Sequence, residues 1–334
     1  LQYIYERGDH FGAPNEAQTF MSKLPGFLQK NGFYAAQGIG LSVVPRADGL
    51  NTVKWFVSRD PSAEALPLWR AMVGGAPRVL VGADFLPADT VVADTGTGEL
   101  SDLWKMIRAG VAELTSPQTA ASFDKSVSSL STNMGIDMDK VFGSLGGEGF
   151  FSIQLSRTAT VDIPSSTGGA AVKIPQPSLL IGLAVKDDAL LKAIEAPLKR
   201  GNLPVMKTQA ESVEVSTLNL PLPVPFPIQP SYAVCSNFFL FGSTPQVVTD
   251  AIKAFREKNA LVASPEFKKA FEGLPTTNNG IFYMSPRFMK TVIDLQMAMA
   301  RSGTNNIADA PLRRILARRG DMQSAFVTQN LKTG

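Results

Sequence analysis

The 334-residue sequence holds one cysteine and one histidine, and it lacks any long apolar run. A single thiol excludes an internal disulfide and a cysteine-based zinc site, so Cys235 serves neither. No stretch approaches the roughly 18 consecutive apolar residues of a membrane-spanning helix, so no transmembrane segment is expected. His10 stands near the chain start, where the backbone is least ordered and a catalytic base is hard to hold in place. We therefore expect no catalytic triad.

Charge is scarce and balanced. Lys and Arg number 32 against 29 Asp and Glu, which gives a net charge of +3 spread along the chain. Nucleic-acid binders concentrate basic residues on one surface, so no nucleic-acid partner is expected. With 44% hydrophobic residues, a chain of this length can bury a large core and does not need disulfide or metal cross-links to fold. The opening letters, LQYIYERGDHFG, have no Met and no leader pattern, which indicates a processed or trimmed start.

The sequence does contain a repeated pattern, in which a short apolar strand is followed by an amphipathic helix. Three such units start near Leu179, Phe238 and Ile281, and Pro245 and Pro286 stand at or near the first helical turn. These units predict an α+β fold with mainly antiparallel sheet and helices layered on one face. We expect the three helices to lie on the same side of one sheet.

Two parts of the chain are expected. Residues 1–74 read as the tail of a preceding module, with a helix that ends at Gly32, a hairpin and a short helix. Residues 75–334 read as the main α+β module, with two sub-lobes as an alternative. The letters YIY at the chain start and IFY at residues 281–283 each precede a helix and then a strand, so a design of repeated lobes stays open.

The stretch MGIDMDKVFGSLGGEGFFSIQL, residues 134–155, contains acidic residues at the spacing of a calcium-binding loop. Val141 and Phe142 occupy the positions where such a loop needs an oxygen ligand and a glycine. The glycines follow a helix and precede a strand, the reverse of a phosphate loop. We therefore expect no metal or cofactor here; Asp137 is instead the N-cap of a short helix that the segment from Gly143 to Gly149 ends before the next strand. The three acidic residues concerned are Asp137, Asp139 and Glu148.

The tract LPLPVPFPIQP, residues 220–230, has the most unusual composition in the chain. Alternating prolines fix an extended backbone with few N–H donors. One reading is an edge strand that lies on its own core, and the other is an exposed ridge that contacts a partner. The partner surface would consist of the intervening side chains, which are Leu222, Val224, Phe226 and Ile228.

Six sequence segments follow one another in a characteristic order: FLPADTVV, GIDMDKVFGSLGGE, LLIGLAVKDDALLKAI, YAVCSNFFLFGSTPQVVTDAI, LVASPEFKKAFEGLP and GIFYMSP. This order, from Phe85 to Pro286, resembles a bacterial family known as domain of unknown function 3352, whose members are often predicted to be exported. The resemblance implies a periplasmic or cell-surface location and a non-enzymatic default. No catalytic residues are established for that family, so none carries over.

Three functions remain. The first is a non-catalytic extracytoplasmic or envelope-associated binding protein that acts through surfaces, with a protein, lipid or envelope polymer as partner. The second is a structural or assembly spacer built from tandem modules. The third is a hydrolase of unrecognised type, which a cleft with convergent perturbed carboxylates would favour. A large apolar cavity would favour the binding protein.

Overall fold

The computed structural model describes residues 14–46, 51–163, 171–219, 228–302 and 324–331. Contacts divide the chain into two units that interleave along the sequence. We call residues 1–74, 98–143 and 331–334 the helical unit, and residues 75–97 and 144–330 the sheet unit. Residues 98–143 thus group with residues 1–74, although the sequence placed them in the module of residues 75–334.

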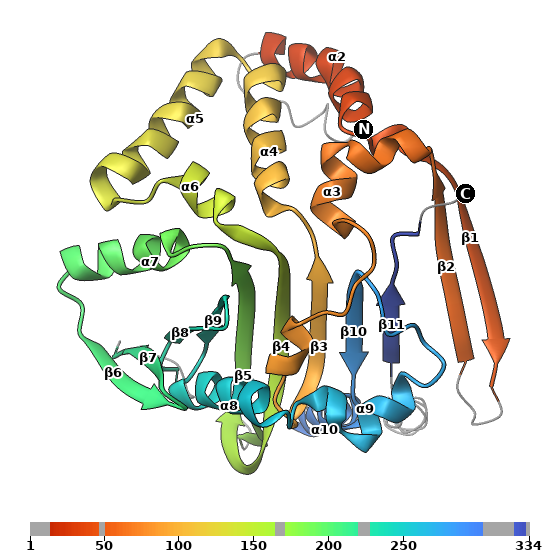
Figure 1. Cartoon of the computed structure of the whole chain (residues 1–334), viewed down its shortest axis with the longest axis vertical. Coiled ribbons are helices and arrows are strands. Elements are labelled where there is room, and N and C mark those ends of the chain that lie inside the picture. The colour runs from red at the N-terminus through yellow and green to blue at the C-terminus, as the bar shows by residue number, and fades with distance from the viewer. Residues whose placement is uncertain (1–13, 47–50, 164–170, 220–227, 303–323, 332–334) are drawn as a thin grey trace. The chain divides into compact units, whose positions relative to one another are not determined.

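The helical unit combines helices with one hairpin (Figure 1). Gly32 follows α2 with φ 92°, a left-handed conformation that glycine adopts without strain, and so ends this helix as predicted. Ser116 caps α5 by accepting a hydrogen bond from the backbone N–H of Thr119. The elements are α2 (Pro14–Lys30), η2 (Phe33–Ala35), β1 (Ala36–Pro45), β2 (Asn51–Arg59), η3 (Pro61–Ala65), α3 (Pro67–Val73), α4 (Leu100–Leu114), α5 (Pro117–Ser129), η5 (Leu130–Met134) and α6 (Met138–Gly143).

In the sheet unit, nine described strands form one antiparallel sheet in the order β11-β10-β3-β4-β5-β9-β8-β7-β6. This confirms the predicted α+β class with an antiparallel sheet. The strands are β3 (Thr90–Thr97), β4 (Leu145–Ile163), β5 (Val172–Val185), β6 (Val205–Ala210), β7 (Val213–Leu218), β8 (Ser231–Cys235), β9 (Phe238–Gly242), β10 (Gly280–Met284) and β11 (Ser324–Thr328). The helices are η4 (Gly82–Phe85), α7 (Ala189–Arg200), α8 (Pro245–Glu257), η6 (Leu261–Ala263), α9 (Pro265–Ala270) and α10 (Pro286–Ser302).

The main core of the sheet unit lies under α8. Figure 1 shows α8 and α9 in front of the sheet. Val248 and Ile252 of α8 are fully buried together with Leu240 of β9. Thr244 caps α8 and Pro245 takes the first helical position, as predicted. Among the described helices of both units, none is long and apolar enough to cross a membrane.

The helices of the sheet unit cover both faces of the sheet. Side chains alternate along a strand, so Leu240 and its neighbour Phe239 point to opposite faces. Leu240 packs in the core under α8, whereas Phe239 packs with Tyr232 against the apolar side of α7. The expectation that the helices after Leu179 and Phe238 share one side was therefore wrong. The apolar stripe of a helix requires cover by a sheet but does not specify which face.

Candidate functional site

The predicted partner surface lies mostly outside the described residues. Leu222, Val224 and Phe226 fall in the undescribed range 220–227. Ile228 is described and half-buried, three residues before β8. The choice between a ridge for a partner and a strand on its own core therefore stays a prediction.

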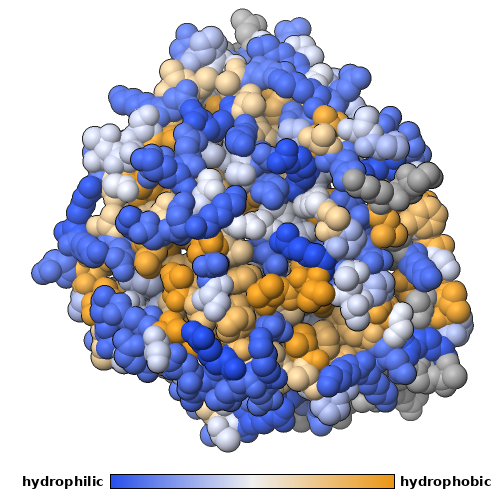
Figure 2. Space-filling model, viewed as in Figure 1, coloured by the Kyte–Doolittle hydropathy of each residue, from blue (hydrophilic) through white to orange (hydrophobic). Residues whose placement is uncertain are grey.

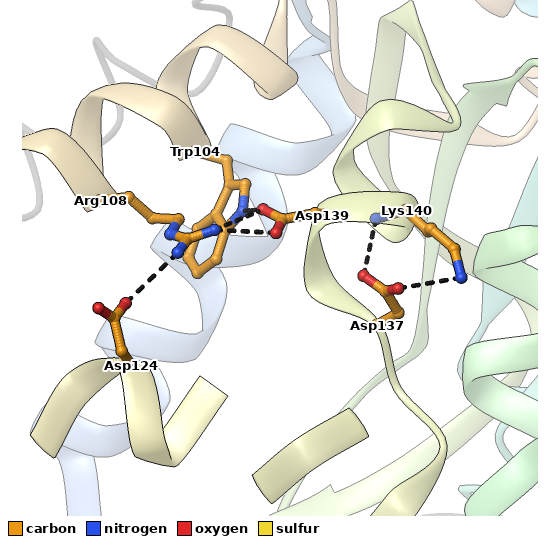
Figure 3. Close-up of polar contacts among 6 residues, drawn as sticks. All are labelled: Trp104, Arg108, Asp124, Asp137, Asp139 and Lys140. Carbon is orange, nitrogen blue, oxygen red and sulfur yellow. Dashed lines mark hydrogen bonds and ion pairs between the residues drawn. The ribbon is translucent and has the colours of Figure 1, made fainter. Parts of the chain in front are cut away.

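Asp137 and Asp139, the two aspartates at calcium-loop spacing, contact other residues of the helical unit (Figure 3). Asp137 accepts a hydrogen bond from the backbone N–H of Lys140 at 3.2 Å and pairs with the Lys140 ammonium at 3.1 Å. These hydrogen bonds lower the pKa of the Asp137 carboxyl. Because α6 begins at Met138, Asp137 is the helix N-cap that the sequence predicted.

Asp139 joins a second set of contacts. Its carboxylate accepts hydrogen bonds from the indole N–H of Trp104 at 2.7 Å and from the Arg108 guanidinium at 2.8 Å. The same guanidinium also pairs with Asp124 at 3.4 Å, and the contact with Asp139 raises the pKa of Arg108 (Figure 3). The Trp104 ring stacks on Phe142, with 5.0 Å between centroids. This cluster joins α4, α5 and α6.

Glu148 belongs to the sheet unit and is buried there. Its carboxylate accepts a hydrogen bond from the backbone N–H of Gly82 at 2.5 Å and lies 3.5 Å from the Arg78 guanidinium. It thus holds the loop before η4 against β4. Asp137, Asp139 and Glu148 thus each accept hydrogen bonds from protein groups and form ion pairs with them. In the described ranges, no group of three or more His, Cys, Asp or Glu side chains could hold a metal ion.

The hairpin of β1 and β2 presents an apolar surface. Ile39 pairs with Val57 and Val43 pairs with Val53 across the two strands, so these side chains and Leu41 share one face. We call this set of five the apolar hairpin face; the exposed fractions run from 37% for Val53 to 73% for Ile39. In Figure 2, apolar residues form part of the visible surface of this hairpin.

The opposite side of the hairpin differs. Ser42 and Lys54 pair there, and the Phe56 ring lies over Gly40, where any larger side chain would clash. At its base the hairpin is fixed by a hydrogen bond from the Asp60 N–H to the Ala35 carbonyl, at 3.0 Å. Among the described residues β1 and β2 pair only with each other. The hairpin therefore has one apolar face and one mixed face, and the mixed face also exposes Val44 and Phe56.

The sheet unit contains an open pocket of about 660 Å³. One wall is α8, and the other walls are residues 87–89 and parts of β4 and β5. The register of β4 against β5 shifts between Leu155 and Thr160, and this irregularity includes Ser156 and Ala159, which line the pocket. We call this cavity the polar pocket.

Two aspartates give the polar pocket its electrostatic character. Burial raises the pKa of the Asp250 carboxyl, and the hydrogen bond that it accepts from the Gln246 amide, at 2.7 Å, offsets this in part. Asp89 faces the pocket from the loop before β3 and accepts a hydrogen bond from the Arg157 guanidinium at 2.5 Å. This ion pair connects the loop to the irregular part of β4.

Neither surface was predicted as a site. The hairpin itself was predicted, and the alternation of Ile39, Leu41 and Val43 with Gly40 and Ser42 is visible in the sequence. It carried no signal that the face would stay exposed. The polar pocket is lined by segments far apart in sequence, and its one local signal is the polar stripe of Gln246, Asp250 and Glu257 on α8.

Comparison with known proteins finds a family match. A family model described as "Protein of unknown function (DUF3352)" matches residues 162–328, which is half of the chain. Searches of curated proteins and of solved structures find no match. The matched range starts at the end of β4 and runs to the end of β11, so it covers most of the sheet unit. The chain belongs to the family of proteins of unknown function described as DUF3352.

Proposed function

We propose that this protein is a non-catalytic binding protein of the extracytoplasmic space that holds a partner protein on its apolar hairpin face. The observation that carries the proposal is the exposure of five apolar side chains on one side of an isolated two-stranded sheet. A lone hairpin is marginally stable in water, and patches of this kind mark interaction sites. Selection against aggregation removes such faces unless a partner covers them.

The energetics favour a partner that presents a β-strand. Fully burying an aliphatic side chain stabilises by about 1.5–3 kcal/mol, and these side chains are already partly covered, so the face supplies about 5 kcal/mol. Association itself costs about 4–15 kcal/mol, so the apolar face alone is a weak site. Each strand of the hairpin also has an edge without a described partner, and an added strand would contribute main-chain hydrogen bonds there.

Two further observations support the non-catalytic and extracytoplasmic parts. The two carboxyls whose pKa burial raises, Asp94 and Asp250, do not share a cleft: Asp94 alternates along β3 with Ala93, which belongs to the core under α8. Convergent perturbed carboxylates would have favoured a hydrolase. Cys235 is buried, so an oxidising compartment meets no exposed thiol on the described surface.

The test uses two lysine substitutions on opposite faces of one strand. We expect Leu41→Lys to abolish partner binding without unfolding the protein, because the Leu41 side chain is 56% exposed. Ser42→Lys is the matched control and leaves binding unchanged. Binding is measured by photo-crosslinking in cells from a residue introduced at Ile39 or, as control, at Ser58.

The proposal requires a discrete crosslinked species from position 39, its absence from position 58, and its loss in Leu41→Lys. Equal crosslinking from both faces contradicts it. A loss of more than about 2 kcal/mol of unfolding free energy in Leu41→Lys also contradicts it, because that loss means the side chain packs inside the molecule.

A further inference from the structure

The polar pocket lies in the sheet unit and is independent of the hairpin. Most of its described lining residues carry side chains that can form hydrogen bonds, among them four glutamines: Gln154, Gln176, Gln229 and Gln246. None of the described lining residues is aromatic. Ligand pockets for apolar molecules are lined mainly by aliphatic and aromatic residues, so a lipid or hydrophobic metabolite does not suit this lining.

Charge narrows the ligand class further. The lining carries the carboxylates Asp89, Asp250 and Glu257 against one cation, Lys253. A phosphate or nucleotide would meet more negative than positive charge, which raises the electrostatic cost of binding. Asp89 is neutralised by the Arg157 guanidinium and lies 3.8 Å from Arg287. The pocket is therefore poor for anions, and its acidic groups are only partly available to cations.

The hydrogen-bonding groups suit a ligand whose atoms both donate and accept. Amide side chains such as Gln176 and Gln229 present a donor and an acceptor side by side, and the Asp250 carboxylate adds acceptors. Hydroxyl groups donate and accept at one oxygen, so vicinal hydroxyls on a ring match these planar groups. The volume of about 660 Å³ lies within the range of small-ligand sites, which is about 300–1,000 Å³.

The walls are fixed rather than incidental. Ser156 accepts hydrogen bonds from the backbone N–H groups of Thr158 and Ala159, at 3.2 and 2.9 Å, and so shapes the irregular segment of β4. The Arg157 guanidinium holds this segment to Asp89 on the opposing loop. Gln154 is buried, and its amide donates to the Ser152 hydroxyl at 3.3 Å. A pre-formed wall lowers the ordering cost of binding.

We propose that the polar pocket binds an uncharged, hydroxyl-rich ligand, namely one or two sugar units of a neutral saccharide. No described lining residue offers an aromatic ring for stacking, so we expect the affinity to rest on hydrogen bonds, with a dissociation constant of about 1 mM. The site goes beyond the proposed function, because its ligand class and its unit both differ from those of the hairpin.

The experiment is a ligand-observed saturation-transfer NMR titration of the full chain. The probes are maltotriose, cellotriose, mannotriose and chitotriose, each raised to about 10 mM, ten times the expected dissociation constant. Trialanine and spermidine represent a peptide backbone and a cation. Ala159→Trp fills the pocket from an exposed position, and Thr158→Trp places the same ring on the neighbouring residue that does not line it.

We expect at least one trisaccharide to bind saturably, with affinity lowered at least tenfold in Ala159→Trp and retained in Thr158→Trp. Asp250→Asn, which keeps the shape of the side chain, lowers affinity about tenfold through loss of a charged hydrogen bond. Leu41→Lys on the hairpin binds the saccharide like the wild type. The proposal is overturned if none of the four saccharides binds, if Ala159→Trp leaves their binding unchanged, or if trialanine or spermidine alone binds.

Discussion

The sheet unit and the hairpin of the helical unit both contain strands with alternating apolar residues, yet only the sheet unit covers them. Leu240 of β9 is fully buried under α8, whereas Leu41 of β1 is 56% exposed. Both leucines lie in the interior of a short strand, Leu240 between Phe239 and Phe241 and Leu41 between Gly40 and Ser42. The difference shows that a period of two defines an apolar face, while cover depends on elements far away in sequence or on another molecule.

The largest expected effect on stability distinguishes two single variants, Leu240→Ala and Leu41→Ala. Leu240→Ala should lower the free energy of unfolding by about 2–5 kcal/mol, because it leaves a cavity in a packed core. Leu41→Ala should change it by less than about 0.5 kcal/mol, as exposed positions do. Urea denaturation monitored by circular dichroism measures both. If both variants lose a similar amount of unfolding free energy, the hairpin face is covered in the same way as the core.

A second pair of variants compares carboxylates. The Glu148 side chain in the sheet unit is 5% exposed, whereas that of Asp139 in the helical unit is 60% exposed. Glu148→Ala should cost about 1–3 kcal/mol, because the backbone N–H of Gly82 loses its buried acceptor. Asp139→Ala should cost at most about 1 kcal/mol, the usual range for an exposed ion pair.

Melting or denaturant curves of Glu148→Gln complete this comparison. Glutamine keeps an acceptor for Gly82 but not the charge facing Arg78, so it should recover most of the loss. If Glu148→Gln is as unstable as Glu148→Ala, the ion pair with Arg78 dominates instead.

The smallest effect is a pH dependence of opposite sign in the two units. The raised pKa of Asp250 means that its contribution to stability is present below the ordinary pKa of about 3.9 and is lost as pH rises through the folded-state value. The lowered pKa of Asp137 means the reverse: its contribution is present above about 3.9 and is lost as pH falls through the folded-state value.

The measurement is the unfolding free energy of Asp250→Asn and Asp137→Asn relative to wild type, from about pH 3 to neutral pH. Towards neutral pH, Asp250→Asn should gain stability and Asp137→Asn should lose it. Differences of the same sign in both variants would show that burial and capping do not distinguish these carboxyls.

Local signals in the sequence predicted much of the fold. Pro245 and Pro286 start helices, Gly32 ends one and Asp137 caps one, because each of these roles depends on a few adjacent residues. The antiparallel α+β class followed from the repeated strand and helix units. The face chosen by α7 was not predictable, since its apolar stripe could pack against either side of the sheet.

The candidate sites were less accessible to prediction. The apolar hairpin face required knowing that its five side chains stay largely exposed, which depends on the tertiary structure. The polar pocket combines a loop, two strands and α8, and the shift of register between Leu155 and Thr160 that opens it has no distinctive sequence. The proline tract did stand out in the sequence, yet Leu222, Val224 and Phe226 lie outside the described residues.

The order of strands has a consequence for biosynthesis. In the finished sheet β3 lies between β4 and β10, but in the chain residues 98–143 separate it from β4, and β10 begins only at Gly280. On the ribosome, β3 therefore emerges long before its second neighbour exists. Pairings across such separations form slowly, and open strand edges expose nascent chains to association. A chain that stalls before Gly280 would present the apolar residues of β3 along an unpaired edge, at a position that the finished sheet covers with β10 and β11.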